Sequence, residues 1–268
     1  MTETLPYPLL NGEQLNGLVA LTDDALFEAC GVRIAFTGRD GGTSTGPYAS
    51  LNTGDHVEDD FACVHRNREI VLRALGFPQA QLVVPNQVHG TNIVHVEDVA
   101  DVPGVIELAK QGADAVVVET GGVAALLNFA DCLPLIVVAP DGRFAVAHAG
   151  WRGALAGIAG KAARALADIS QDAAGFNAYI GPHIRQECFE TSEEIARQFA
   201  DAYGEGVLAD SRHVSLARAV MTDLVRAGMQ ADRIADADIC TVCNCERYFS
   251  YRAAGGTCGR HAAVAVRK

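Results

Sequence analysis

The chain has 268 residues, of which 49% are hydrophobic and 20% are charged, and its formal net charge is −12. These values are ordinary for a folded globular protein and exclude disorder as the main state. The negative charge argues against a nucleic-acid partner, because phosphate backbones are bound by basic surfaces. The N-terminus has no basic and apolar signal segment, and no apolar span approaches membrane length, so we expect a cytoplasmic protein without a membrane partner.

The first half of the chain alternates short apolar runs with turn residues. Residues 1–30 are predicted to be an N-terminal lead-in with turns at Asn11-Gly12 and Asn16-Gly17. A strand at 32–37 is followed by a glycine-rich loop over 38–47 and by a helix over about 59–75, where apolar side chains recur at helical spacing. Further strands are then predicted at 81–85, 92–96, 115–118, 123–129, 135–139 and 144–147, with a hairpin at Pro140-Asp-Gly142.

The second half contains more helix. Apolar residues at i, i+3 and i+4 spacing predict an amphipathic helix over 153–169. The later elements are a strand at 177–180, helices at 192–202 and 216–227, and hairpin-like segments at 247–253 and 262–266. This mixture predicts an α+β fold, since hairpins are too frequent for a doubly wound sheet. Because no repeat or linker is found, residues 1–268 are expected to form a single catalytic domain.

Three short segments each place a metal-binding side chain immediately beyond a hydrophobic strand. They contain His89, Cys132 and His148 within the runs Asn-Gln-Val-His-Gly, Ala-Asp-Cys-Leu-Pro and Ala-His-Ala-Gly-Trp-Arg-Gly. Strand ends of one sheet lie close together, so we expect these side chains to converge. Two imidazoles and one thiolate suit zinc, and three protein ligands leave a fourth position open, as in catalytic zinc sites. The alternative for each residue is a packing role, because free cysteine often behaves as a small buried hydrophobe.

Polar side chains near these segments are candidates for substrate contact. The connection over 147–153 leads from a strand into a helix, so helix N–H groups together with Arg152 would bind an anion such as phosphate. The alternative for Arg152 is an ion pair at the surface. The loop over 41–47 lacks the Gly-Lys-Ser/Thr ending of a P-loop. It is predicted either to line a pocket, with Arg39 and Asn52 as polar contacts, or to be a surface turn.

A second group of cysteines lies near the C-terminus: Cys240, Cys243 and Cys245, with Cys258 and His261 beyond. In a reducing compartment, cysteines are free thiols, metal ligands or nucleophiles before they are disulfides. The Cys-x-x-Cys spacing suits a structural zinc site, but the second such pair that is usual in zinc ribbons is absent. The sequence leaves open whether this cluster binds metal.

In their order along the chain, the three histidine and cysteine segments resemble the YfiH-type family, described as polyphenol oxidases of the laccase-domain type and as multifunctional purine nucleoside phosphorylases. The resemblance extends from about residue 34 to residue 266. Where the family often has cysteine after Ile-Gly-Pro, this chain has His183, which would alter substrate preference if that position contacts substrate. Supporting matches are the segment from Arg39 to Asn52, Ile180-Gly-Pro182, Cys240-Thr241 and Phe249-Ser-Tyr-Arg252.

The resemblance implies a mixed β-sandwich flanked by helices, with zinc held by His89, Cys132 and His148. It also implies phosphorolysis of adenosine, inosine and methylthioadenosine, with adenosine deamination as a companion activity, so the expected partners are a purine nucleoside and phosphate. Copper also binds two histidines and a cysteine, which keeps a copper-dependent polyphenol oxidase as an alternative. None of the eight histidines, however, forms the His-x-His pairs of a multicopper oxidase.

The predicted catalytic residues are Asp131 and Cys132. Asp131 precedes a ligand and would either transfer a proton or orient its neighbour, and the sequence does not decide between these roles. In a different class of function, Cys132 would be a nucleophile activated by His89 or His148 in an amide hydrolase, with a cell-wall peptide precursor as substrate. In a third class, the metal centre would be a sensor that turns over no nucleoside.

Overall fold

The computed structural model of the protein describes residues 4–170 and 172–268. Its helices are α1 (Asp24–Cys30), α2 (Phe61–Ala74), α3 (Val102–Lys110), α4 (Trp151–Leu155), α5 (Ile158–Ala167), α6 (Glu193–Tyr203) and α7 (Leu216–Arg226). Its strands are β1 (Asn11–Leu15), β2 (Leu18–Thr22), β3 (Val32–Thr37), β4 (Gln81–Val83), β5 (Ile93–Val96), β6 (Ala115–Val118), β7 (Val123–Phe129), β8 (Leu133–Val138), β9 (Phe144–Ala149), β10 (Asn177–Ile180), β11 (Ile234–Asp236) and β12 (His261–Arg267).

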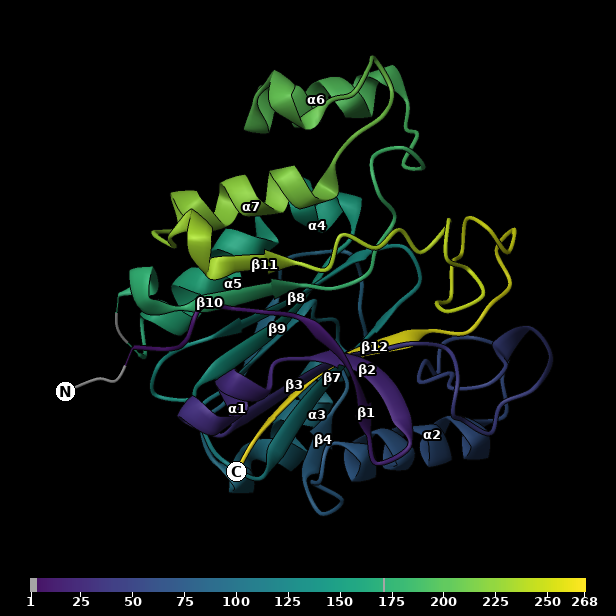
Figure 1. Ribbon diagram of the computed structural model, residues 1–268, viewed down its shortest axis with the longest axis vertical. Coiled ribbons are helices and arrows are strands. Elements are labelled where there is room, and N and C mark those ends of the chain that lie inside the picture. Colours follow the sequence, from purple (N-terminus) through teal and green to yellow (C-terminus); the bar gives the residue numbers. More distant parts are fainter. Residues whose placement is uncertain (1–3, 171) are drawn as a thin grey trace.

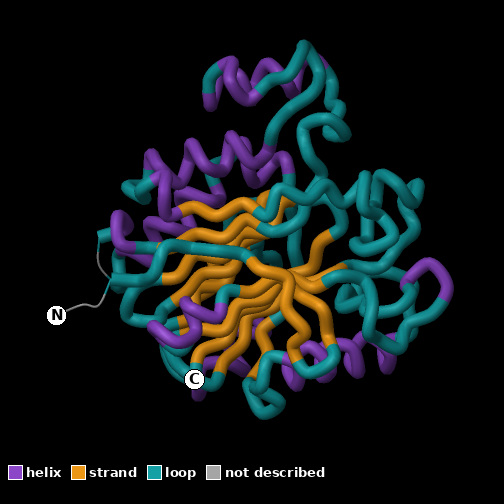
Figure 2. The backbone as a smooth tube through the Cα atoms, viewed as in Figure 1, coloured by secondary structure: helices purple, strands orange, loops and turns teal. Residues whose placement is uncertain are grey.

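The strands form two six-stranded sheets that pack against each other (Figure 1). One sheet has the order β1-β2-β3-β12-β7-β4, and the other has the order β11-β10-β8-β9-β6-β5. Both sheets are mixed, because β4 pairs with β7, β5 with β6 and β10 with β11 in parallel while the other pairs are antiparallel. Figure 2 shows helices on both sides of the strands and long loops gathered at one end of the molecule.

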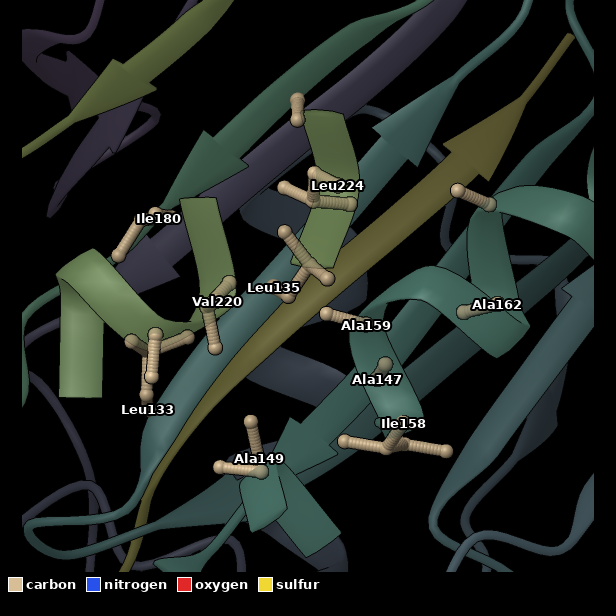
Figure 3. Close-up of a cluster of buried hydrophobic side chains, with 14 of the residues drawn as sticks. Leu133, Leu135, Ala147, Ala149, Ile158, Ala159, Ala162, Ile180, Val220 and Leu224 are labelled. Carbon is tan, nitrogen blue, oxygen red and sulfur yellow. The ribbon is translucent and has the colours of Figure 1, made fainter. Parts of the chain in front are cut away.

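Alternating side chains of the central strands build three apolar layers, because successive residues of a strand point to opposite faces. In β8, Ile136 and Val138 pack between the two sheets, whereas Leu133, Leu135 and Val137 pack against α5 and α7. Figure 3 shows this helical face, where the small residues of α5 allow the helix to lie close to the sheet. On the other outer face, α2 covers the sheet that contains β7 and β12.

The predicted mixed sandwich flanked by helices is confirmed. Strand predictions at 32–37, 115–118, 123–129 and 177–180 coincide with β3, β6, β7 and β10. The predicted hairpin at Pro140-Asp-Gly142 joins β8 to β9, which pair antiparallel. No helix in the described part of the chain has both the length and the apolar character needed to cross a bilayer.

Several expectations from sequence differ from the structure. The helix predicted over 153–169 is two helices, α4 and α5, because Gly157 between them has a φ of 74°, which ends one helix before the next begins. The Asn16-Gly17 turn is present, but Asn11-Gly12 begins β1 instead of forming a turn, so the lead-in contains a hairpin. The segment over 247–253 consists of turns rather than strands. The elements α1, α3 and β11 had not been predicted.

The apolar layer between the sheets predicts where stability is concentrated. Leu127 of β7 is fully buried in that layer, whereas Leu108 of α3 is 57% exposed. Leu127→Ala is expected to lower the free energy of unfolding by about 2–5 kcal/mol, because it leaves a cavity between the sheets. Leu108→Ala should change it by less than about 1 kcal/mol, since alanine is a good helix former. Urea unfolding measures both values, and equal effects would contradict this assignment of the core.

Candidate metal centre

His89, Cys132 and His148 converge in the folded chain. Their potential ligand atoms all lie within 4.8 Å of one another. The Cys132 Sγ is 3.8 Å from the His89 Nε2. The centroids of the His89 and His148 rings are 4.8 Å apart, and the rings meet edge to face. The described residues thus contain the grouping that the sequence predicted for a metal centre.

Strand register explains why these distant residues meet. His148 lies within β9 and pairs with Pro134 of β8, and Cys132 comes directly before β8, so the two side chains are neighbours. His89 lies in the loop between β4 and β5. The side chain of Gln87 fixes this loop to the edge of β7: its amide donates to the carbonyl of Asn128 at 2.9 Å and accepts the Asn128 N–H at 2.8 Å.

The carboxylate of Asp114 connects two of the three candidate ligands. It accepts the N–H groups of His89 at 2.9 Å and Gly90 at 2.6 Å, and it lies 2.8 Å from the Nδ1 of His148. The His89 backbone has a φ of 61°, so these bonds hold a left-handed turn that places its ring toward Cys132. Because Asp114 bonds Nδ1, the Nε2 of His148 remains as the ligand atom, as in carboxylate–histidine–metal arrangements.

The electrostatics of the centre favour ionised Cys132 and Asp114. Burial raises the pKa of Cys132, but the charge of His148 and hydrogen bonds from His148 and His89 outweigh it and lower the pKa to about 6. Burial lowers the pKa of His148, but Cys132 and Asp114 together raise it to about 9. For Asp114, burial raises the pKa, yet the His148 contact and the N–H groups of Gly90 and His89 bring it below its ordinary value.

The donor set and its surroundings fit a zinc ion. Zinc bonds of about 2.0–2.3 Å to nitrogen and sulfur require donors roughly 3.5 Å apart, close to the separation found here. Gly150 packs directly against all three candidate ligands: a Cβ at this position would lie 2.6 Å from the His89 ring, 3.3 Å from Cys132 Sγ and 3.4 Å from the His148 ring. Glycine therefore leaves the space in which the ligands approach one another.

The three residues line one end of a cavity of about 360 Å³. This volume lies in the range of small-molecule sites. Trp151, Phe189 and Tyr251 contribute aromatic surface to its lining, while Arg252 and Arg260 contribute positive charge. The cavity thus combines a flat apolar surface with cations, next to the metal-binding side chains.

His56 also lines the cavity. Burial and the nearby Arg260 cation lower the pKa of this histidine below its ordinary value. At neutral pH it is therefore an uncharged imidazole with one donor and one acceptor nitrogen.

Asp131 lines the cavity beside Cys132, as a catalytic residue would. Both of its carboxylate oxygens are engaged: Thr241 Oγ1 donates to one at 2.6 Å, and the Arg252 N–H donates to the other at 2.7 Å. Asp131 has a φ of 90°, and its own carbonyl accepts the N–H of Ile184 at 2.9 Å. These contacts join three loops immediately before the cysteine.

Arg39, Asn52 and Arg152, predicted to contact substrate, lie outside the lining of this cavity. Arg39 donates to the carbonyls of Ala49 and Cys245 and thereby ties two loops together. Asn52 is buried and accepts the N–H of Arg260 at 2.8 Å, so it positions a cavity residue. Arg152 lies over the ring of Trp151, 4.3 Å from its centre, in a helix of only five residues.

Three residues of the site were not singled out from the sequence: Asp114, His56 and Arg260. Thr241 was part of the matched pair Cys240-Thr241, but no role was predicted for it. Asp114 had one local signal, since an acidic residue stands directly before the wholly buried strand β6. Arg252 belonged to a recognised motif, but nothing in its spacing indicated that its backbone would bond Asp131. The other contacts depend on loops that meet only in the folded chain.

Comparison with known proteins places this chain among characterised relatives. The family model described as multi-copper polyphenol oxidoreductase laccase matches residues 33–268. A purine nucleoside phosphorylase of Deinococcus radiodurans is 37% identical over 235 residues, which cover 86% of this chain and 87% of the relative. An adenosine deaminase, RL5, from an unknown prokaryotic organism is 30% identical over 80% of this chain and 85% of its own length.

The fold has a counterpart among solved structures. YfiH of Bacillus licheniformis superposes with a TM-score of 0.86 at 26% identity, covering 98% of this chain and 100% of that one. The family match, the sequence identities and this shared architecture together identify the chain as a member of the YfiH-type, laccase-domain family.

Proposed function

We propose that this protein is a zinc-dependent purine nucleoside phosphorylase that acts on adenosine, inosine and methylthioadenosine, with adenosine deamination as a companion activity. The observation that carries the proposal is the convergence of His89, Cys132 and His148 at a cavity of nucleoside size. The names of the relatives, purine nucleoside phosphorylase and adenosine deaminase, support the same substrate class.

His89, Cys132 and His148 would hold the zinc ion, and three protein ligands would leave a fourth position for substrate or water. When bound, zinc supplies a Lewis acid that polarises an oxygen of the substrate or activates water. Two imidazole nitrogens and a sulfur also suit copper. A three-copper cluster, however, needs more histidines than the two that this grouping contains.

The cavity lining supports recognition of both substrates. A purine would stack on the aromatic side chains, of which Tyr251 is 54% exposed and Phe189 is buried. Arg252 and Arg260 would bind phosphate, because each guanidinium offers five N–H donors and uses only some of them on backbone carbonyls. Asn52 would act indirectly by holding Arg260. Arg39 and Arg152 would contact the substrate only if the Arg39 loop or the helix α4 moved toward it.

In phosphorolysis, a phosphate oxygen forms the bond to C1′, the bond from C1′ to N9 breaks, and the purine takes up a proton. Positive charge develops on the ribose, and the negative charge of a phosphate bound by Arg252 and Arg260 would offset it. In deamination, water replaces the amino group at C6 and ammonia leaves. We assign Asp131 an orienting role, since Thr241 and Arg252 occupy both of its oxygens.

Product analysis tests the proposal. Zinc-loaded protein incubated with inosine should release hypoxanthine and ribose 1-phosphate only when phosphate is present, and adenosine should yield some inosine with or without phosphate. His89→Ala should lower both rates by at least about 100-fold, because it removes a metal ligand. His95→Ala is the matched control, since His95 lies on β5 outside the cavity lining. Chromatography identifies and quantifies the products. The absence of both reactions would refute the proposal.

Gly150 offers a test of the metal centre that leaves its donors in place. Its φ of −65° suits alanine, so Gly150→Ala should fold, but the new Cβ would push the His89 ring and Cys132 apart. The ion of this centre is expected to be lost on dialysis, so bound zinc should fall by about one ion per chain relative to the unaltered protein. Gly206→Ala is the control, because a Cβ there meets nothing within 4 Å. Unchanged zinc content would show that the three side chains are not the ligands.

The lowered pKa of Cys132 keeps the thiol-nucleophile alternative open and also provides its test. In metal-free protein, the rate of Cys132 alkylation by iodoacetamide should rise with an apparent pKa of about 6, and the thiolate–imidazolium pair with His148 should persist up to about pH 9. The unfolded chain should give the ordinary value near 8.5. Bound zinc should protect the thiol. Mass spectrometry measures the alkylation of Cys132. Equal alkylation with and without zinc would favour the amide hydrolase instead.

A further inference from the structure

A second cluster of metal-ligating side chains lies outside the cavity. Glu187, Cys188, Cys240 and Cys243 place one ligand atom each within 4.8 Å of one another. Glu187 and Cys188 belong to the loop that follows β10, whereas Cys240 and Cys243 belong to the loop that follows β11. None of the four lines the cavity that contains His89. The cluster is therefore distinct from the catalytic centre, and it joins two separate loops.

We propose that Glu187, Cys188, Cys240 and Cys243 bind a second zinc ion in a closed, structural site. Four protein donors complete the tetrahedral coordination of zinc and leave no position for substrate, which is the arrangement of structural zinc sites. In the sequence, Cys240 and Cys243 form one Cys-x-x-Cys pair, and the second pair that a structural zinc site usually has is absent. The fold supplies the missing half from the other loop through Cys188 and Glu187.

The distances fit zinc better than a disulfide. Zinc–sulfur bonds of about 2.3 Å require sulfurs about 3.8 Å apart. The sulfurs of Cys188 and Cys243 are 3.5 Å apart, so the loops need little movement to coordinate the ion. A disulfide needs its sulfurs about 2.0 Å apart and would leave the Cys240 thiol and the Glu187 carboxylate unused.

The surroundings of the cluster also suit thiolates that bind a cation. The backbone N–H of Arg185 points to the Cys240 sulfur at 3.5 Å, a contact that stabilises a metal-bound thiolate. The guanidinium of Arg185 is paired with Asp236 and Asp238. This cation is thus already engaged, and zinc would supply the positive charge that three thiolates and a carboxylate require.

The place of the cluster in the fold indicates what the ion would do. Residues 237–260 form no helix or extended strand, and Figure 1 shows this yellow loop reaching away from the sheets. The loop nevertheless contains Thr241 and Arg252, the two residues that hold the Asp131 carboxylate. The guanidinium of Arg252 also bonds the Cys188 carbonyl at 3.1 Å. Zinc at the cluster would fasten this loop and so fix the wall of the cavity beside Cys132.

Metal stoichiometry in a variant without the catalytic site tests the proposal. Untagged protein is purified with reductant, loaded with zinc, desalted and analysed by atomic emission. The unaltered protein should bind about two zinc ions per chain, and His89→Ala with Cys132→Ala should bind about one. Adding Cys243→Ser should remove the remaining ion. Adding Cys245→Ser instead should retain it, because Cys245 is also exposed on this loop but lies outside the cluster.

Two further readouts separate a structural zinc ion from loose surface binding. With cobalt in place of zinc in the double variant, the thiolate charge-transfer band should be present and should be lost with Cys243→Ser. Chelation should speed hydrogen exchange in residues 237–260 while leaving β7 and β8 unchanged. The double variant lacks the catalytic ligands, so these results do not depend on nucleoside activity. No zinc in the double variant, or a Cys188–Cys243 disulfide in the reductant-purified protein, would overturn the proposal.

Discussion

One buried carboxylate, that of Asp114, determines the geometry of the metal centre. It is fully excluded from solvent, and an unpaired charge in such a place would cost several kcal/mol. Its partners are the N–H groups of His89 and Gly90 and the imidazole of His148. The same bonds that offset the burial also set the left-handed turn at His89 and the orientation of the second histidine. The hydrogen bonds that stabilise the buried charge are therefore the same ones that place the candidate ligands.

Local pattern predicted those parts of the fold that are wholly buried. The runs that became β6 and β7 are apolar apart from Asn128, which indicates buried strands, and their predicted limits match the structure. The hydrophobic pattern failed to predict element boundaries that are set by backbone conformation. Apolar periodicity continues across Gly157, so one helix was expected where a left-handed residue makes two. The helix α3, which is short and has a proline in its first turn, was not predicted.

The candidate ligands could be predicted because imidazole and thiol groups are rare and chemically distinctive. The residues that line the cavity could not be predicted, because an arginine has the same appearance in a sequence whether it lines a cavity or ties loops together. Arg39 fastens loops, whereas Arg252 and Arg260 face the cavity. That difference arises from loops brought together only by the two sheets. The same reason concealed the cluster around Cys188, half of which lies about fifty residues before the cysteine pair.

The three candidate metal ligands come from the β4–β5 loop, the connection between the two sheets, and β9. In the unfolded chain they are dispersed, so affinity for an ion bound by all three would be a property of the native state alone. By mass action, such an ion would shift the folding equilibrium toward the native sandwich by RT ln(1 + [L]/Kd), where [L] is the concentration of the free ion. Supply of that ion would thus influence how much of this protein stays folded, as well as how much is active.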